Sequence, residues 1–302
     1  MKVMKAVIPA AGYGTRLLPA TKSQPKEMLP VVDKPAIQYV IEEAVASGIN
    51  DILVITGRGK RAIEDHFDRS FELESSLKDS EKHDYFEQIR SIADLADIHY
   101  IRQKELNGLG HAIYTAKKYV GSEPFVILLG DIIVNNGNPC TKSLIDLFNS
   151  NKAPVVGVER VSMEKVDRYG IVDAKKINET TYKIKGLIEK PSPNESPSNL
   201  AIFGRYVLTP DIFDCIEHTT PGKNGEIQLT DALNLYLKKT DLYAYEVSGD
   251  RYDIGSKIDW LKANIEIALK REDLAEELRQ YLALLNLEPK VINDKVTVKE
   301  QK

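Results

Sequence analysis

The chain has 302 residues, 42% of them hydrophobic and 28% charged, which is enough apolar material for the core of one large or two modest domains. It contains no uncharged apolar run long enough to cross a membrane. Its formal net charge of −4, without a basic stripe, argues against a nucleic-acid-binding protein. Cys140 and Cys215 stand far apart and the five histidines lack paired metal spacing, so a zinc enzyme is not indicated.

The N-terminal segment carries Lys2 and Lys5 before a short apolar run. That run ends at Pro9 and a glycine-bearing loop, so it is too short for a secretory signal and shows no cleavage site. We therefore expect a cytoplasmic protein without a membrane partner.

In the first half of the chain, strand-like and helix-like segments alternate, which predicts an α/β fold with a mainly parallel sheet. Strands are expected at 3–9, 52–56, 98–101 and 125–129, and helices at 35–47 and about 110–119. The charged stretch at about 63–95 is typical of helices on a solvated, inserted segment.

The second half is β-rich. Strands are expected at 155–161, 170–173, 182–189 and 201–208, a Pro-, Ser- and Asn-rich loop at 191–199, and helices at about 256–270 and 272–285. We find no internal repeat and no linker that separates two domains. The expected fold is therefore Rossmann-like and doubly wound, with a mixed, mainly parallel sheet, a β-rich extension and C-terminal helices.

The loop after the first strand reads PAAGYGTR. Gly12 and Gly14 permit backbone conformations that bring N–H groups close to an anion, and Arg16 adds a cation. The dinucleotide fingerprint fails because Leu17 replaces its third glycine, and a Walker P-loop fails at Arg61. On its own, the loop also fits a tight βα turn.

A second cationic segment follows, KSQPKEMLP, with Lys22 and Lys26 close to Arg16 in the sequence. Such a cluster can hold a triphosphate, although a loop lysine such as Lys22 is also typical of a solvated surface.

Together the two segments form GxGTRLxPxTKxxPKxxLPVxxKP at 12–35. With this signature, the chain resembles the bacterial-type UTP–glucose-1-phosphate uridylyltransferases, within the sugar-1-phosphate nucleotidyltransferases, from about residue 4 to about residue 285. The segments PKEMLP, NGLGHA, PSNLA and GEIQLTDA favour the UDP-glucose branch over the dTDP-glucose branch. The resemblance implies a nucleotidyltransferase domain at 1–270, with a nucleotide-binding half at about 1–135 and a sugar-phosphate-binding half at about 150–255. A C-terminal helix and tail would occupy 271–302.

The resemblance also implies roles for single residues at the nucleotide. Arg16 and Lys26 would be the catalytic cations that bind its phosphates. Gln103 and Gly108 would read the uracil, although the sequence alone also fits Gly108 as an ordinary helix entry. The loop residues that would lie along the nucleotide are Ala10, Ala11, Gly12, Gly14 and Thr15.

Asp131 directly follows the strand expected at 125–129. Ligands of α/β proteins bind at the carboxyl ends of such strands, and Mg²⁺ prefers one or two carboxylates plus phosphate oxygens. Asp131 is therefore predicted to be catalytic and the principal Mg²⁺ ligand. Asp253 matches the family position of a second metal carboxylate, but it also fits a turn-capping Asp.

The sugar phosphate needs a separate pocket, for which the resemblance implies the segments YGIVD and IEKP. Catalytic Lys190 would pair with the 1-phosphate, and Glu189 would accept hydrogen bonds from glucose hydroxyls. Glu226 would either contact the sugar or shape the site. The implied sugar-phosphate-binding residues are Gly170, Glu189, Lys190, Asn199, Gly204 and Glu226.

The implied reaction is Mg²⁺-dependent transfer of UMP from UTP to glucose 1-phosphate, with these two small molecules as partners and a homo-oligomer, dimer or tetramer, as the assembly. Two alternatives stay open: a thymidylyltransferase or related enzyme, and a catalytically silent nucleotide-sugar-binding regulator. A nicotinamide dehydrogenase is disfavoured by the missing third glycine.

Overall fold

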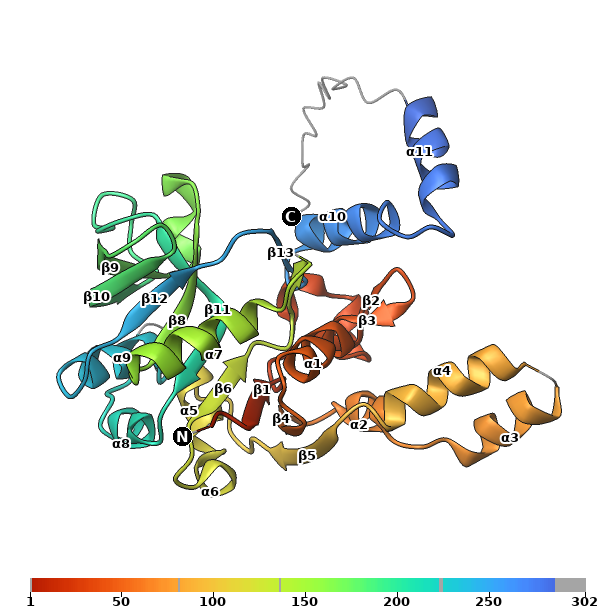
Figure 1. Ribbon diagram of the computed structural model, residues 1–302, viewed down its shortest axis with the longest axis horizontal. Helices are drawn as coiled ribbons and strands as arrows, with labels where there is room; N and C mark the ends of the chain where they lie inside the picture. The colour runs from red at the N-terminus through yellow and green to blue at the C-terminus, as the bar shows by residue number, and fades with distance from the viewer. Residues whose placement is uncertain (1, 81, 136, 223–224, 286–302) are drawn as a thin grey trace, which may run out of the picture.

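The computed structural model describes residues 2–80, 82–135, 137–222 and 225–285. Its centre is a nine-stranded sheet in the order β5-β4-β1-β6-β11-β8-β12-β10-β9 (Figure 1). The strands from the first half are β1 (Lys5–Pro9), β4 (Asp51–Thr56), β5 (Asp97–Arg102) and β6 (Phe125–Leu128). These four pair in parallel, so their carboxyl ends share one edge of the sheet.

The second half extends the same sheet with mixed pairings. Its strands are β8 (Val155–Arg160), β9 (Gly170–Lys176), β10 (Thr181–Glu189), β11 (Leu200–Leu208) and β12 (Tyr243–Glu246). Strand β11 runs antiparallel to both β6 and β8, and it joins the two halves. Strand β9 pairs back onto β11 at Ile171 and Ala201, which curls this half of the sheet.

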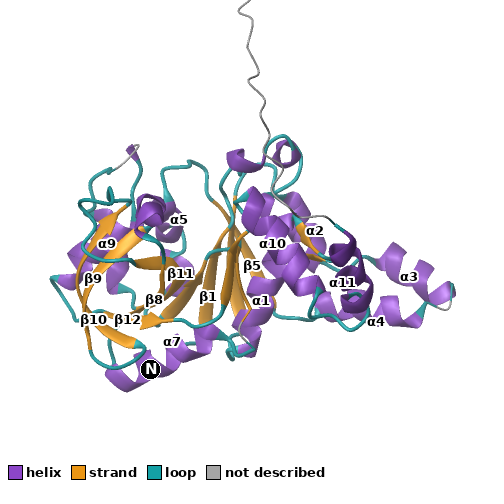
Figure 2. Cartoon of the chain, turned by 90° about the horizontal axis from the view of Figure 1, so that it is seen from above, coloured by secondary structure: helices purple, strands orange, loops and turns teal. Residues whose placement is uncertain are grey.

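Apolar residues on both faces of the sheet explain why helices cover both sides (Figure 2). In β1, Val7 packs into one core cluster while Ala6 and Ile8 pack into the other, as the alternation of a strand requires. One cluster takes in α1 (Ala36–Ala46), α2 (Arg61–Phe67) and α7 (Cys140–Asn151). The other takes in α5 (Leu109–Tyr114), α6 (Lys117–Val120), α8 (Asp211–Glu217) and α9 (Leu229–Leu237).

Two short two-stranded sheets place residues near the end of the described chain beside residues of its first half. Strand β13 (Asp250–Asp253) pairs with β7 (Ile132–Asn135), and β2 (Pro30–Val31) pairs with β3 (Lys34–Pro35). Helix α10 (Lys257–Ala268) packs on both of these sheets, and a third apolar cluster joins Val31, Ile133, Tyr252 and Ala263. As a result, residues 250–255 lie beside the turn at Asp131.

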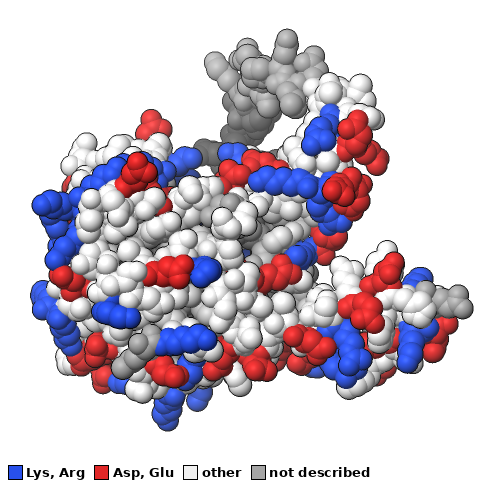
Figure 3. Space-filling model, in the orientation of Figure 1, with Lys and Arg blue, Asp and Glu red and all other residues white. Residues whose placement is uncertain are grey.

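Three helices lie at the periphery. Helices α3 (Phe71–Asp79) and α4 (His83–Ala93) project as a hairpin, and α11 (Ala275–Leu284) follows α10 (Figure 1). Basic and acidic side chains are interspersed over the hairpin and over the visible face of the body (Figure 3). Within the part of the chain that the structure describes, no helix is long and apolar enough to cross a bilayer.

The predicted fold class is confirmed: the protein is α/β and doubly wound, with a mixed sheet and C-terminal helices. The parallel part, however, is confined mainly to the first half. The prediction of one helix at 110–119 is wrong, because it breaks into α5 and α6 around Thr115, whose hydroxyl donates to the Ala112 carbonyl. Helices α7, α8 and α9 and strands β7, β12 and β13 were not predicted. The predicted tail beyond Leu285 lies outside the described residues.

Candidate active site

A cleft with a volume of about 1360 Å³ opens at the carboxyl ends of the parallel strands and is lined from both halves of the chain. The first half contributes the loop at 11–16, Lys26, Gln103, Gly108 and Asp131. The second half contributes Tyr169, Lys190, Phe203, Glu226 and Asp253, among others. Residues predicted to bind the nucleotide and residues predicted to bind the sugar phosphate therefore meet in one cavity.

The glycine loop is shaped by its contacts with the neighbouring cationic segment. Gly14 has φ +68°, and a Cβ there would lie 3.2 Å from the Lys26 Cβ. The Thr21 hydroxyl donates to the Gly14 carbonyl at 2.8 Å. A Cβ at Gly12, in contrast, would meet no atom within 4 Å, so this part of the loop offers an open backbone to a ligand.

Lys26 and Asp131 form the charged centre of the cleft, with Nζ and Oδ2 2.5 Å apart. Burial alone would lower the pKa of Lys26, but Asp131 and Glu27 outweigh it and hold that pKa above its usual value. Burial would raise the pKa of Asp131, but the Lys26 ammonium outweighs it and holds that pKa below its usual value. Both groups are therefore charged at neutral pH.

A second ion pair joins Arg16 to Asp253, with Nη1 and Oδ2 3.2 Å apart. The Gly255 N–H donates to Asp253 Oδ1 at 2.8 Å, and the Ile254 N–H donates to the Asp131 carbonyl at 2.8 Å. A Cβ at Gly255 would meet both the Arg16 guanidinium and Asp253 Oδ1, so glycine leaves room for the arginine in its observed position. The backbone thus couples the two ion pairs.

The donor set fits Mg²⁺ held partly by a substrate. Asp131 and Asp253 both line the cleft, while the described residues contain no group of three or more His, Cys, Asp or Glu that could hold a metal ion. Mg²⁺ in nucleotide sites commonly uses one or two carboxylates and takes its remaining ligands from phosphates and water. A site with two protein carboxylates meets that requirement.

Gln103 and Gly108, which are predicted to read the base, both line the cleft. The Gln103 backbone N–H donates to the Thr56 carbonyl at 2.8 Å, and its Nε2 lies 3.0 Å from His111 Nδ1. Gly108 has φ +95°, and a Cβ there would lie 2.8 Å from both the Glu226 Cβ and the Ile227 carbonyl oxygen. Gly108 is therefore more than an ordinary helix entry, because it lets two distant segments touch.

Lys190, which is predicted to bind the sugar phosphate, lines the cleft, and its Nζ lies 2.8 Å from Glu189 Oε1. The Thr230 hydroxyl donates to Glu189 Oε2 at 2.6 Å. A Cβ at Gly170 would lie 2.8 Å from that hydroxyl oxygen, so Gly170 packs against the same group. Gly170 and Glu189 thus lie directly behind Lys190.

Gly170 and Glu189 do not line the cleft themselves, and three further predicted residues also lie away from its wall. Asn199 accepts from Arg160 at 3.1 Å and donates to the Val161 carbonyl at 3.2 Å, which ties two strand ends together. Gly204 has φ +95° at an irregularity of β11, where a Cβ would lie 2.6 Å from the Leu129 side chain. Ala10 is buried and extends the ladder by donating to the Ile55 carbonyl at 2.8 Å.

Sequence reasoning missed two ion pairs beside the cleft, one buried and one partly buried. Glu27 and Lys60 form an ion pair at 2.8 Å directly behind Lys26, and burial raises the pKa of Glu27. Arg251 lines the cleft, pairs with Glu159 at 2.5 Å and lies 5.2 Å from the Tyr169 ring centre. The motif PKEMLP carries Glu27, but its spacing does not show that Lys60 lies against it.

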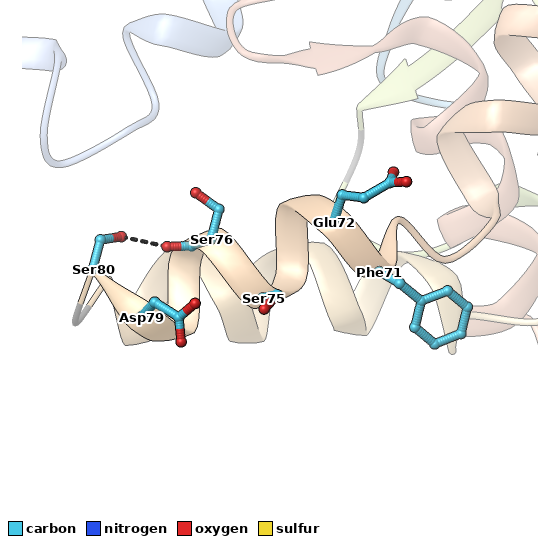
Figure 4. A pocket seen from close by; sticks show the side chains of 6 residues that line it. All are labelled: Phe71, Glu72, Ser75, Ser76, Asp79 and Ser80. Carbon is cyan, nitrogen blue, oxygen red and sulfur yellow. Dashed lines mark hydrogen bonds between the residues drawn. The ribbon is translucent and has the colours of Figure 1, made fainter.

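A second hollow lies on the projecting helix α3 (Figure 4). Its walls carry two carboxylates, three serines and a phenyl ring, and Ser80 donates to the Ser76 carbonyl at 2.8 Å. A phosphate would meet like charge here, so this hollow does not compete with the cleft as a nucleotide site. Its lining residues are Phe71, Glu72, Ser75, Ser76, Asp79 and Ser80.

The chain is similar to known proteins over most of its length. The model of the nucleotidyl transferase family matches residues 5–270. UTP–glucose-1-phosphate uridylyltransferase 2 from Staphylococcus saprophyticus is 50% identical over 286 residues, which cover 95% of this chain and 99% of that protein. A UTP-bound UGPase from Acinetobacter baumannii is 41% identical with a TM-score of 0.88, and the match covers 94% of this chain and 99% of that one. A UDP-glucose pyrophosphorylase in complex with UDP-glucose is 44% identical with a TM-score of 0.81, covering 89% and 100%.

Proposed function

The chain belongs to the nucleotidyl transferase family, and from this membership we propose that its cleft catalyses Mg²⁺-dependent transfer of UMP from UTP to glucose 1-phosphate. The products are UDP-glucose and pyrophosphate. The observation that carries the proposal is the cleft itself, which is lined by the ion pairs Lys26–Asp131 and Arg16–Asp253 and also by Lys190. The nucleotide is assigned to the half at 1–135 and the sugar phosphate to the half at 150–255.

The reaction needs no general base from the protein. An oxygen of the sugar 1-phosphate is anionic at neutral pH and attacks the α-phosphorus of UTP in line. The bond from that phosphorus to the bridging oxygen of pyrophosphate then breaks, and the electron pair leaves with pyrophosphate. Catalysis therefore consists of positioning and of stabilising charge on phosphate oxygens.

Each cation of the site has a defined task in this proposal. Lys26 and Arg16 bind the phosphates of the nucleotide, and their carboxylate partners place them before the nucleotide arrives. Lys190 binds the 1-phosphate of the sugar, and Glu189 holds the lysine through an ion pair. Glu189 is also assigned to the sugar hydroxyls. Asp131 and Asp253 would hold Mg²⁺, which supplies further charge neutralisation at the phosphate oxygens when bound.

The deciding experiment measures pyrophosphate release from glucose 1-phosphate and Mg²⁺ with UTP, dTTP, CTP, ATP or GTP in parallel. We expect a strong preference for UTP. A preference for dTTP would show that the enzyme is a thymidylyltransferase and would contradict the assignment of uracil as the base. If no nucleotide gives pyrophosphate release but the protein binds UDP-glucose, the protein is a catalytically silent nucleotide-sugar-binding regulator and not an enzyme.

Removal of the metal tests the Mg²⁺ assignment separately. Treatment with a chelator is expected to abolish pyrophosphate release, and excess Mg²⁺ to restore it. Asp131→Asn should raise the Mg²⁺ concentration needed for half-maximal rate. Full activity after complete chelation would contradict the assignment.

We also propose that the protein is a homo-oligomer, a dimer or tetramer. Helix α11 leaves Tyr281 and Leu284 exposed by 58% and 84%, which favours packing on a second subunit over packing on the core. Light scattering should give a multiple of the 33.9 kDa chain mass. Leu284→Glu should lower it, whereas a monomeric wild-type protein would refute the proposal.

A further inference from the structure

A histidine stands behind the glutamine that is assigned to the base. Gln103 is 5% exposed, lies directly after β5 and lines the cleft, and its backbone N–H is bound to Thr56. Its Nε2 lies 3.0 Å from Nδ1 of His111, a partly buried residue in the first turn of α5. One end of the Gln103 amide therefore has a partner inside the protein.

The position of His111 is itself fixed by tertiary contacts. The Gly110 N–H donates to the Ile227 carbonyl, and the Ile227 N–H donates to the Asn107 carbonyl, both at 2.8 Å. These two bonds join the start of α5 to the segment before α9. The imidazole is thus carried on a backbone that cannot shift without breaking both.

The direction of the Gln103 amide decides which base it can pair with. An amide oxygen facing the base accepts from the N3–H of uracil, and the neighbouring N–H donates to a uracil carbonyl. Cytosine has an acceptor at N3 and an amino donor beside it, so it requires the amide turned by 180°. A freely turning amide would accept either base.

His111 distinguishes the two directions. A neutral imidazole with its proton on Nε2 has an acceptor at Nδ1, which matches the Gln103 N–H. With the proton on Nε2, turning the amide would set Oε1 against the Nδ1 lone pair, and the turned amide becomes compatible only if the imidazole proton moves to Nδ1. The turned form is therefore disfavoured as long as the imidazole keeps its proton on Nε2.

We propose that His111 is a positioning residue that fixes the Gln103 amide and thereby makes the cleft select uracil over cytosine. The inference rests on the proposed function, in which Gln103 reads the base. His111 acts on nucleotide choice without touching the reacting phosphates. Its loss should therefore change the discrimination between UTP and CTP, while turnover at saturating UTP remains close to that of the wild type.

The test compares kcat/KM for UTP and for CTP in the wild type and in His111→Leu. We expect the ratio of the two values to fall about ten-fold, the order of one lost orienting hydrogen bond. KM for UTP should rise, with little change in kcat or in KM for glucose 1-phosphate. Thr115→Val, which removes a side-chain hydrogen bond at the C-terminal end of α5, is the matched control and should leave the ratio unchanged.

A second variant tests whether His111 acts by setting the direction of the Gln103 amide or only by packing against it. His111→Asn keeps a polar group near the position of Nδ1, but its amide can either accept or donate. It should therefore retain the thermal stability of the wild type while the ratio still falls. If it restores the wild-type ratio in full, the imidazole does not set the direction.

The double variant shows whether His111 acts through Gln103. In a Gln103→Ala background, His111→Leu should change the ratio no further. If the two substitutions lower the UTP-to-CTP ratio independently, so that their fold-changes multiply in the double variant, the inference is wrong. An unchanged ratio in His111→Leu would also overturn it. A wild-type enzyme without preference for UTP would instead refute the proposed function itself, so the two failures are distinguishable.

Discussion

At the scale of single residues, the site depends on charges that are set before substrate binds. Lys26 is held by Asp131, and Arg16 by Asp253, so neither cation has to be ordered during the reaction. Preorganised charge of this kind usually contributes more to enzyme catalysis than any other single effect, since it costs no reorganisation at the transition state.

Lys26→Ala and Asp131→Asn should each lower kcat by about 10²–10³-fold, the range seen when one preorganised charge or donor is removed. We expect the variants to remain folded but to lose some stability, because each leaves the charge of the other residue without its partner. Steady-state pyrophosphate release measures the loss, and circular dichroism checks the fold. Wild-type turnover under saturating Mg²⁺ in either variant would remove that residue from the mechanism.

Lys190→Ala should act on a different substrate. Because Lys190 is assigned to the sugar 1-phosphate, we expect KM for glucose 1-phosphate to rise at least ten-fold, about 1.4 kcal/mol, while KM for UTP changes little. Initial rates with either substrate varied give both constants. Lys183→Ala, which removes an exposed lysine of the same strand region, serves as the control. An unchanged KM for glucose 1-phosphate would contradict the assignment.

At the scale of elements, one buried ion pair connects a helix, a strand and the catalytic turn. Arg205 of β11 is fully buried, and its Nη2 lies 2.8 Å from Oε2 of Glu43 on α1. The same nitrogen donates to the Ile132 carbonyl at 2.7 Å, next to Asp131. Thr141 and Cys140, at the start of α7, also donate to Glu43. The pair thus fixes the turn that carries Asp131.

Arg205→Met should therefore cost about 3–5 kcal/mol in the free energy of unfolding, because it leaves the Glu43 carboxylate buried without its partner. Urea denaturation measures this loss. Replacing Lys183, whose ion pair with Asp241 is exposed, should cost less than about 1 kcal/mol and provides the comparison. A loss in Arg205→Met no larger than in this control would show that the pair does not support the fold.

At the scale of the whole molecule, stability should depend on pH through this pair. Burial would raise the pKa of Glu43, but Arg205 and the donors from Cys140 and Thr141 outweigh it and hold the pKa below its usual value. The unfolded state then binds a proton more readily than the folded state. The stabilisation is complete above the ordinary carboxyl pKa and is lost as pH falls through the lower, folded pKa.

We therefore expect the free energy of unfolding to decrease from about pH 5 downwards, as measured by urea denaturation at a series of pH values. Glu27, whose pKa burial raises, opposes this trend in part. Glu43→Gln should flatten the acid limb of the curve. An identical pH dependence in that variant would show that Glu43 is not a source of the acid sensitivity.

The continuous sheet also predicts how the protein unfolds. Because β11 pairs with β6 of the first half and β8 of the second, the two halves should melt in one transition. UDP-glucose, which would contact both halves, should add about 2.7 kcal/mol of stability at one hundred times its Kd. Differential scanning calorimetry tests both points. Two separate transitions, with only one shifted by the ligand, would contradict them.

The sequence by itself determined the class of fold and the segments that carry chemistry. Buried strands at 52–56 and 125–129 are readable because strands covered on both faces form continuous apolar runs. Gly12 and Gly14 follow the first strand, and Asp131 follows the strand at 125–129. Their positions after parallel strands mark the edge of the sheet where ligands bind, and this is also readable from neighbouring residues alone. Helices such as α8 and α9 were missed because short segments bounded by coil carry weak periodic signals.

Only the tertiary structure decided which of these segments meet. Lys26 reaches Asp131 across 105 residues, and Arg16 reaches Asp253 across 237. The contacts of Gly108 with Ile227 and of Arg205 with Glu43 are equally non-local. Local pattern reflects only the periodicity and turn chemistry of neighbouring residues. Pairings over such distances depend on the order of strands in the sheet, which packing of the whole chain selects.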